Sequence, residues 1–102
     1  MSTVSDAVPA AVGVHVVLRE GETSVLHVRS YDGVVRCGTE FRRAFGINRW
    51  RREGPPIDVR LTVVRIRLYG RDFDCLDSGL TGALTVTGIV PMELGEGWVV
   101  SE

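Results

Sequence analysis

The feature that most constrains the fold is the segment from Ile57 to Tyr69, where apolar and polar residues alternate and the alternation changes phase once. Up to Val63 the apolar residues occupy odd-numbered positions, and from Val64 onward they occupy even-numbered ones. A period of two indicates a β-strand with one buried face. A one-residue change of phase inside such a strand predicts a β-bulge, which small barrels use to turn corners. We therefore expect a long strand, bent at this point, whose inward side chains are Val59, Leu61, Ile66 and Leu68.

Shorter alternating runs predict further strands near residues 12–18, 24–30, 34–41, 81–90 and 97–101. In the first run, Val14, Val16 and Leu18 share one face. Glycines separate the later runs, as is typical of all-β proteins. The sequence thus predicts an all-β fold, a small closed or nearly closed antiparallel barrel of six or seven strands.

The length of 102 residues fits one domain, and 44% hydrophobic residues can supply its core. We expect residues 1–11 to be a flexible N-terminal lead-in and residues 12–102 to form a single β-barrel domain. No run of residues has the length and apolarity of a membrane span, and no secretion signal precedes the domain, so a cytoplasmic protein without membrane contact is expected. The net charge of −1 excludes a uniformly basic nucleic-acid coat, and any site for a polyanion must be a local patch.

One such patch is an Arg-rich segment at residues 42–52, which carries five arginines and no acidic residue. The nearby Gly54-Pro55-Pro56 favours a loop here, which could include a helical turn. Arginine binds phosphate groups and an exposed aromatic ring can stack on a base, so this mixture suits RNA. The alternative is a solvated loop without a binding role, whose arginines pair with Glu40, Glu53 or the acidic stretch at 72–77. The candidate nucleic-acid-binding residues are Arg42, Arg43, Arg49, Trp50, Arg51 and Arg52.

No catalytic, metal or cofactor site is predicted. His15 and His27 lie on expected strands, opposite the apolar face, and no nucleophile motif accompanies either. The two histidines and two cysteines lack the short spacing of metal ligands. We therefore expect a protein that is not an enzyme and that binds no cofactor, metal or nucleotide.

Two stretches together resemble the second, β-barrel domain of translational GTPases such as elongation factor Tu. Residues 30–41 resemble that family's strand, turn and strand, with Gly33 at the reversal and Gly38 five residues later. Residues 78–89, followed by Glu93-Leu94 and 97–100, resemble its closing pattern of glycine-bounded strands. Between them, residues 57–70 are similar to the long central strand, so the likeness covers roughly residues 12–101. The resemblance implies a translation-factor barrel-like fold.

The departures from that family limit what the resemblance implies about function. The sequence holds no Gly-x-x-x-x-Gly-Lys phosphate loop and no GTPase domain. Cys75 and Thr87 stand where the family has an acidic residue and an arginine that help hold aminoacyl-tRNA. That recognition is not carried over.

The function these observations favour is a non-catalytic binding module that binds RNA or a ribonucleoprotein through the Arg-rich segment. The alternative is a protein-protein interaction adaptor that docks on a protein partner by an apolar patch of the barrel surface, with no nucleic acid involved. An exposed Trp50 among unpaired arginines would favour RNA, whereas a buried Trp50, paired arginines and an apolar patch elsewhere would favour protein docking.

Overall fold

The computed structural model describes residues 8–48 and 51–102, and for Asn48 and residues 51–53 it describes the backbone alone. These residues form nine β-strands and no helix, which confirms the all-β prediction. The strands are β1 (Ala11–Glu20), β2 (Thr23–Asp32), β3 (Val35–Arg36), β4 (Glu40–Asn48), β5 (Arg51–Leu68), β6 (Arg71–Phe73), β7 (Cys75–Leu76), β8 (Thr81–Thr87) and β9 (Trp98–Ser101).

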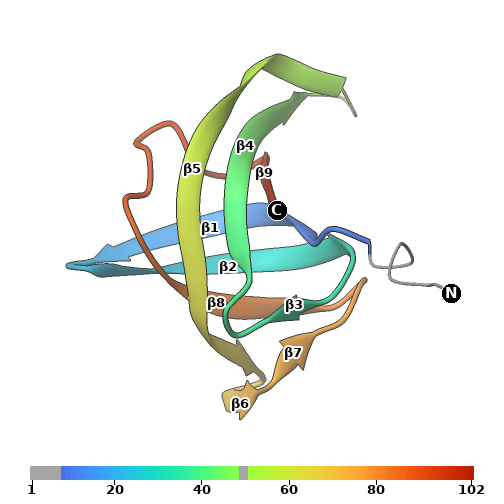
Figure 1. Ribbon diagram of the computed structural model, residues 1–102, viewed down its shortest axis with the longest axis vertical. Helices are drawn as coiled ribbons and strands as arrows, with labels where there is room; N and C mark the ends of the chain where they lie inside the picture. Colours follow the sequence, from blue (N-terminus) through green and yellow to red (C-terminus); the bar gives the residue numbers. More distant parts are fainter. Residues whose placement is uncertain (1–7, 49–50) are drawn as a thin grey trace, which may run out of the picture.

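Six of these strands form a ring of hydrogen-bonded neighbours. The order is β4-β9-β1-β2-β8-β5, and a further pairing of β5 with β4 completes the ring, while β6 extends the sheet beyond β5. Every pairing is antiparallel. Figure 1 shows β4 and β5 running side by side and crossing β1 and β2 steeply. The fold is the nearly closed antiparallel barrel expected from the sequence.

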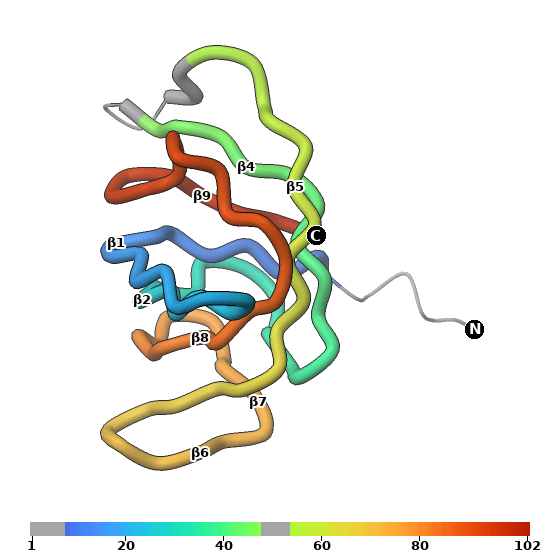
Figure 2. Tube along the Cα trace, turned by 90° about the vertical axis from the view of Figure 1, so that its left-hand side faces the viewer, coloured from blue at the N-terminus to red at the C-terminus, as the bar shows by residue number. Residues whose placement is uncertain are grey.

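The bend in β5 lies where the sequence places it. The register between β5 and β8 shifts between Val63 and Arg65, so Val64 is the extra residue of a bulge and its side chain is 49% exposed. On either side of the bulge, Leu61, Val63, Ile66 and Leu68 are buried in one core, and Val59 packs against it. Because of the bend, the first part of β5 pairs with β4 and the last part with β8 and β6. Figure 2 shows this curvature.

The barrel interior is filled by aliphatic side chains from every strand of the ring, together with Phe41 of β4. Leu26 and Val28 of β2 and Leu84 and Val86 of β8 are buried, as their alternation predicts. Burial of such side chains stabilises the fold by roughly 1.5–3 kcal/mol each relative to leaving them exposed.

The prediction for the second half of β1 is wrong. Val16 and Leu18 are 46% and 45% exposed, although they have the same parity as buried Val14. The cause is a register shift: Val14 pairs with Val28 and Val16 with His27, so His15 is an extra residue in β1. One inserted residue moves every later side chain to the opposite face of a sheet.

The prediction of a loop with a possible helical turn at residues 42–52 is also wrong. β4 continues to Asn48, β5 begins at Arg51, and Ile47 pairs with Arg52. Gly46 pairs with Glu53 and Ala44 with Ile57, so residues 54–56 of β5 lie opposite Phe45 alone. Prolines in sheets are tolerated at such bulges because no ladder hydrogen bond is required of them there. The glycine and prolines therefore bend the strand without ending it.

The expected strand at 34–41 is interrupted. After β3, Gly38 has a φ of 97° and Thr39 N donates to the carbonyl of Arg36 at 3.0 Å, which forms a tight turn before β4. The turn at Gly38 therefore divides the single expected strand into β3 and β4.

At the N-terminus, β1 begins at Ala11, one residue before the expected start of the domain. Ala10 is buried, and its amide donates to Oε1 of Glu102 at 2.7 Å. Residues 1–7 of the expected lead-in lie outside the described part of the chain. Within the described part, no helix has the length and apolarity needed to cross a membrane.

Candidate nucleic-acid interface

The Arg-rich segment is a β-hairpin. Arg42 and Arg43 belong to β4, and Arg51 and Arg52 begin β5, where they pair with Asn48 and Ile47. The structure thus brings four of the six predicted site residues onto two adjacent antiparallel strands. Arg49 and Trp50 lie outside the described residues, and so do the side chains of Arg51 and Arg52.

Arg42 and Arg43 are consecutive, yet both are exposed. In a regular strand, one of two consecutive side chains would point to the core. Here Phe41 pairs with Leu61 and Arg43 pairs with Asp58, so β5 carries an extra residue opposite Arg42, and the regular alternation is broken at this irregularity. Buried Phe41 and Ala44 then flank two outward arginines.

Part of the positive charge of this hairpin is neutralised locally. Arg42 Nε donates to Glu40 Oε1 at 2.8 Å, and Arg60 Nε lies 3.9 Å from Glu40 Oε2. The side chains of Arg42 and Arg60 are 70% and 81% exposed, so these pairs are screened by solvent and hold the arginines weakly. The pairing with Glu40 agrees with the solvated alternative for Arg42, while both guanidinium groups remain accessible to a ligand.

A hollow of about 760 Å³ lies beside these arginines. Arg42 and Arg60 line it together with Asp58, and apolar side chains come from Val59, Ile89 and Pro91. Gly88 also lines the hollow and lies close to β5, because a Cβ on Gly88 would collide with the carbonyl oxygen of Arg60. An apolar surface beside two exposed arginines can accept a planar group next to an anion.

Asp72, in the acidic stretch at 72–77, forms its ion pairs with Arg65 and Arg67 and with neither Arg42 nor Arg60. Asp72 of β6 accepts hydrogen bonds from Arg65 at 2.9 and 3.3 Å and lies 3.5 Å from Arg67 Nε. The hydrogen bond from Arg65 holds the pKa of Asp72 below its ordinary value, and the same bond raises the pKa of Arg65. Asp72 is therefore occupied by arginines of the other half of β5.

The remaining titratable residues are dispersed over the surface. His15 and His27 are both exposed, on the face opposite the apolar side chains as expected. Cys37 is exposed, Cys75 is half-buried, and both are free thiols. Within the described residues no three His, Cys, Asp or Glu side chains are close enough to hold a metal ion.

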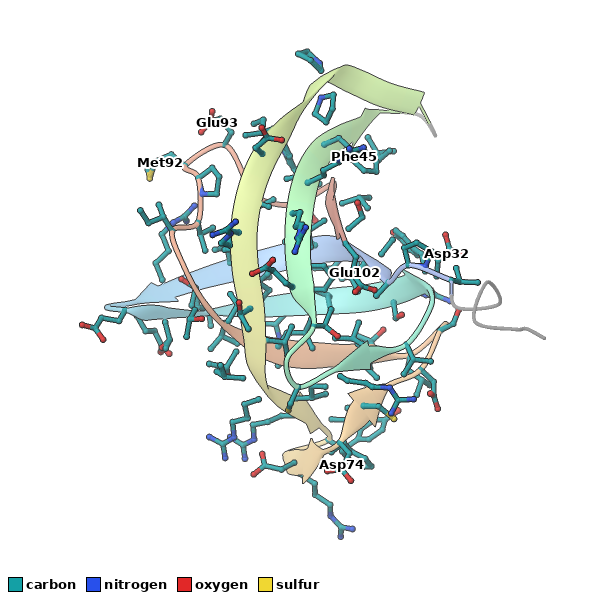
Figure 3. The ribbon with its side chains drawn as sticks, viewed as in Figure 1. Asp32, Phe45, Asp74, Met92, Glu93 and Glu102 are labelled. Atoms are coloured by element: carbon teal, nitrogen blue, oxygen red, sulfur yellow. The ribbon has the colours of Figure 1, made fainter. Side chains whose placement is uncertain are left out.

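Sequence reasoning missed a second concave site, on the outer side of the sheet formed by β4, β9, β1 and β2. This cleft has a volume of about 510 Å³. We call it the aromatic cleft because a ring from each of three strands lines it; its lining includes Tyr31, Phe45, Trp98, Asp32 and Glu96. Figure 3 shows Asp32 and Phe45 on the same side of the barrel. The rings are far apart in the sequence, so no local motif reveals them.

Bulges place two of the side chains in the aromatic cleft. Ala11 pairs with Asp32 and Val12 with Ser30, which makes Tyr31 an extra residue in β2. His15, the extra residue in β1, also lines the cleft. Bulges redirect side chains and are frequent beside functional sites.

Comparison with known proteins identifies the fold. No protein-family model and no curated protein matches the chain. Among solved structures, translation elongation factor SelB from Methanococcus maripaludis, in complex with the GTP analogue GppNHp, matches with a TM-score of 0.73 and 14% identity over 93% of this chain. Its apo form matches with a TM-score of 0.71 and 14% identity over 95% of this chain.

In both cases the chain spans 19% of the SelB chain. The protein therefore has the fold of a barrel-like domain found in a translational GTPase, which confirms the resemblance seen in the sequence. At this level of identity the likeness concerns the fold alone.

Proposed function

We propose that the protein is a non-catalytic, cytoplasmic module that binds RNA, alone or in a ribonucleoprotein, through the β4–β5 hairpin. The observation that supports this most is the register of the hairpin, which places Arg42 and Arg43 at one end of two paired strands and Arg51 and Arg52 at the other. A hairpin is a firmer support than the loop expected from the sequence, because main-chain hydrogen bonds fix the spacing of its side chains.

The ligand contacts follow from the chemistry of these residues. Exposed guanidinium groups bind phosphate oxygens in a bidentate manner, and the hollow beside Arg42 and Arg60 offers apolar surface to a base or ribose. Trp50, which follows Arg49 in the sequence and lies outside the described residues, is the residue we assign to base stacking. No step of this recognition requires a nucleophile, a metal or a nucleotide cofactor.

The test is a binding titration of a fluorescent single-stranded RNA oligonucleotide at low salt, with the whole chain. The variant is Arg49→Gln, Arg51→Gln, Arg52→Gln, and we expect it to weaken binding by at least about tenfold if each arginine contacts phosphate. The matched control is the double variant Arg65→Gln, Arg67→Gln. It removes two positive charges from the last part of β5, where both arginines form ion pairs with Asp72. Equal losses in both variants would indicate a general charge effect and would contradict a site in the hairpin.

A further inference from the structure

The aromatic cleft is apolar on a face where a small barrel is ordinarily polar. Along each barrel strand, interior side chains alternate with exterior ones that face water. Val99 of β9 lies outside the barrel's core cluster, yet it is only 7% exposed, and it lines the aromatic cleft. Its neighbours across the sheet are Phe45 on β4 and Gly13 on β1. The cleft therefore buries apolar surface on the outside of the sheet.

The aromatic side chains are held by the framework of the barrel. Tyr31 lies against Gly13, which has no Cβ to displace the ring. Trp98 packs against the core cluster, and its amide donates to the carbonyl of Gly95 at 3.1 Å. The preceding amide, of Gly97, donates to the carbonyl of Val14 at 3.1 Å, which ties the start of β9 to β1. The strands that carry these rings are thus fixed relative to one another, which lowers the entropy lost on binding.

Among the residues described by the structure, the side chains that give the aromatic cleft a formal charge are acidic. Asp32 and Glu96 are exposed and line it, and within the described residues no arginine does so. Carboxylates repel phosphate groups and attract cations. Aromatic faces also attract cations, through the negative potential above the ring. The volume of about 510 Å³ lies within the range of small-ligand sites.

We propose that the aromatic cleft binds an arginine side chain presented by a partner protein. A guanidinium is planar and more weakly hydrated than an ammonium, so it stacks on aromatic rings while its N–H groups donate to carboxylates. Tyr31 and Phe45 supply ring surface, and Asp32 and Glu96 accept the hydrogen bonds. This inference goes beyond RNA binding by the β4–β5 hairpin, because the ligand has the opposite charge and comes from a different class of partner, although β4 contributes Phe45 and Ile47 to the cleft.

The experiment is a titration of the isotopically labelled whole chain with a capped pentapeptide that has one central arginine between glycines, followed by NMR. The control peptide carries citrulline, a neutral group of nearly the same shape, in place of arginine. We expect the arginine peptide to shift the amide signals of Gly13, Gly97 and Trp98 and to bind about tenfold more tightly than the citrulline peptide.

Variants separate the contribution of the carboxylates to arginine binding from that of the Tyr31 ring. Asp32→Asn with Glu96→Gln should remove the preference for arginine over citrulline, while Tyr31→Ala should weaken binding of both peptides. Both changes lie at exposed positions, and the fold is checked in the same spectra. Asp74→Asn, which removes an exposed carboxylate outside the cleft, should leave affinity unchanged.

Equal affinity of the wild type for both peptides, or no shift at the three amides, would overturn the proposal. Oligouridine that shifts these amides in place of the arginine peptide would also overturn it and would assign the cleft to nucleic acid. Oligouridine that shifts the signals of Arg42 and Arg60, while the arginine peptide shifts the three amides of the cleft, would support both proposals. The two proposals therefore fail independently.

Discussion

Gly13 of β1 lies so close to the ring of Tyr31 of β2 that a Cβ on Gly13 would fall 2.6 Å from both Cε2 and Cζ of that ring. Tyr31 takes this position because it is the extra residue of a bulge between Asp32 and Ser30. The glycine and the bulge together set one side of the aromatic cleft.

Replacing Gly13 by Ala should therefore displace the Tyr31 ring. We expect a loss of at most about 1 kcal/mol in the free energy of unfolding, because the displaced atoms are the far end of a half-exposed side chain and not backbone. Chemical denaturation monitored by circular dichroism measures it.

The double variant Gly13→Ala, Tyr31→Ala provides the control. With the ring absent, Ala at position 13 should stabilise the strand by about 0.5–1 kcal/mol, since glycine in a strand costs more conformational entropy than alanine. The sign of the Gly13→Ala effect should thus reverse between the two backgrounds. Equal effects in both would show that the two residues are not coupled.

The bend in β5 gives a second prediction. Leu61→Ala or Ile66→Ala should each cost about 2–5 kcal/mol of unfolding free energy, because both side chains are fully buried on either side of the bulge. Val64→Ala, at the half-exposed bulge position, should cost less than about 1 kcal/mol. Comparable losses at positions 64 and 66 would contradict the phase change.

The sequence predicts the fold correctly where apolar and polar residues alternate over a long segment and the apolar residues themselves change phase at the bulge. In β5 the pair Val63-Val64 shows the change of phase directly. In β1 the same kind of bulge is hidden, because Val16 and Leu18 are as apolar as the core residues although they are exposed. Only the register with β2 shows that His15 is inserted. Tertiary pairing, not local pattern, decides such positions.

The candidate site shows the same limit. The run of arginines is visible in the sequence, but Gly54-Pro55-Pro56 suggests a loop because these residues usually end a strand. They are accommodated in a bulge opposite Phe45, between the pairs that Glu53 and Ile57 form with β4, and the sequence does not show this pairing. The aromatic cleft could not have been predicted, since its rings come from strands that meet only when the barrel closes.

Ser30 provides a third prediction. Its side chain is fully buried, and its Oγ has no hydrogen-bond partner among the described residues. An unpartnered buried hydroxyl costs roughly 1–3 kcal/mol, so Ser30→Ala should leave stability unchanged or raise it by up to about that amount. A melting temperature that falls in the Ser30→Ala variant would indicate that the hydroxyl has a partner, such as an internal water.

The ion pair of Asp72 with Arg65 predicts a dependence of stability on pH. The pKa of Asp72 is lower in the folded protein than in the unfolded chain. Its contribution is therefore fully present above the ordinary aspartate pKa of about 3.9, and it is lost as the pH falls through the lower, folded value. The difference in unfolding free energy between wild type and Asp72→Asn should shrink over that acidic range.

Arg65→Gln should reproduce the effect of Asp72→Asn, and the double variant should add little to either. Both side chains are exposed, so the difference should also decrease in high salt. A stability difference that is constant from neutral to acidic pH would show that the ion pair does not form in solution.

RNA binding by the β4–β5 hairpin predicts two separable effects on affinity. If three or four arginines contact phosphate, the logarithm of affinity for single-stranded RNA should fall with the logarithm of salt concentration with a slope of about −2 to −3, because each contact releases roughly 0.7 counterion. The variant with glutamines at positions 49, 51 and 52 should flatten that slope, because each lost contact removes its share of released ions. Trp50→Ala should instead lower affinity by about 1–3 kcal/mol at every salt concentration and leave the slope unchanged, because stacking releases no counterions. Fluorescence anisotropy at several salt concentrations measures both quantities. A Trp50→Ala variant with a flatter slope, or a glutamine variant with the wild-type slope, would show that these residues do not divide phosphate contact and stacking in this way.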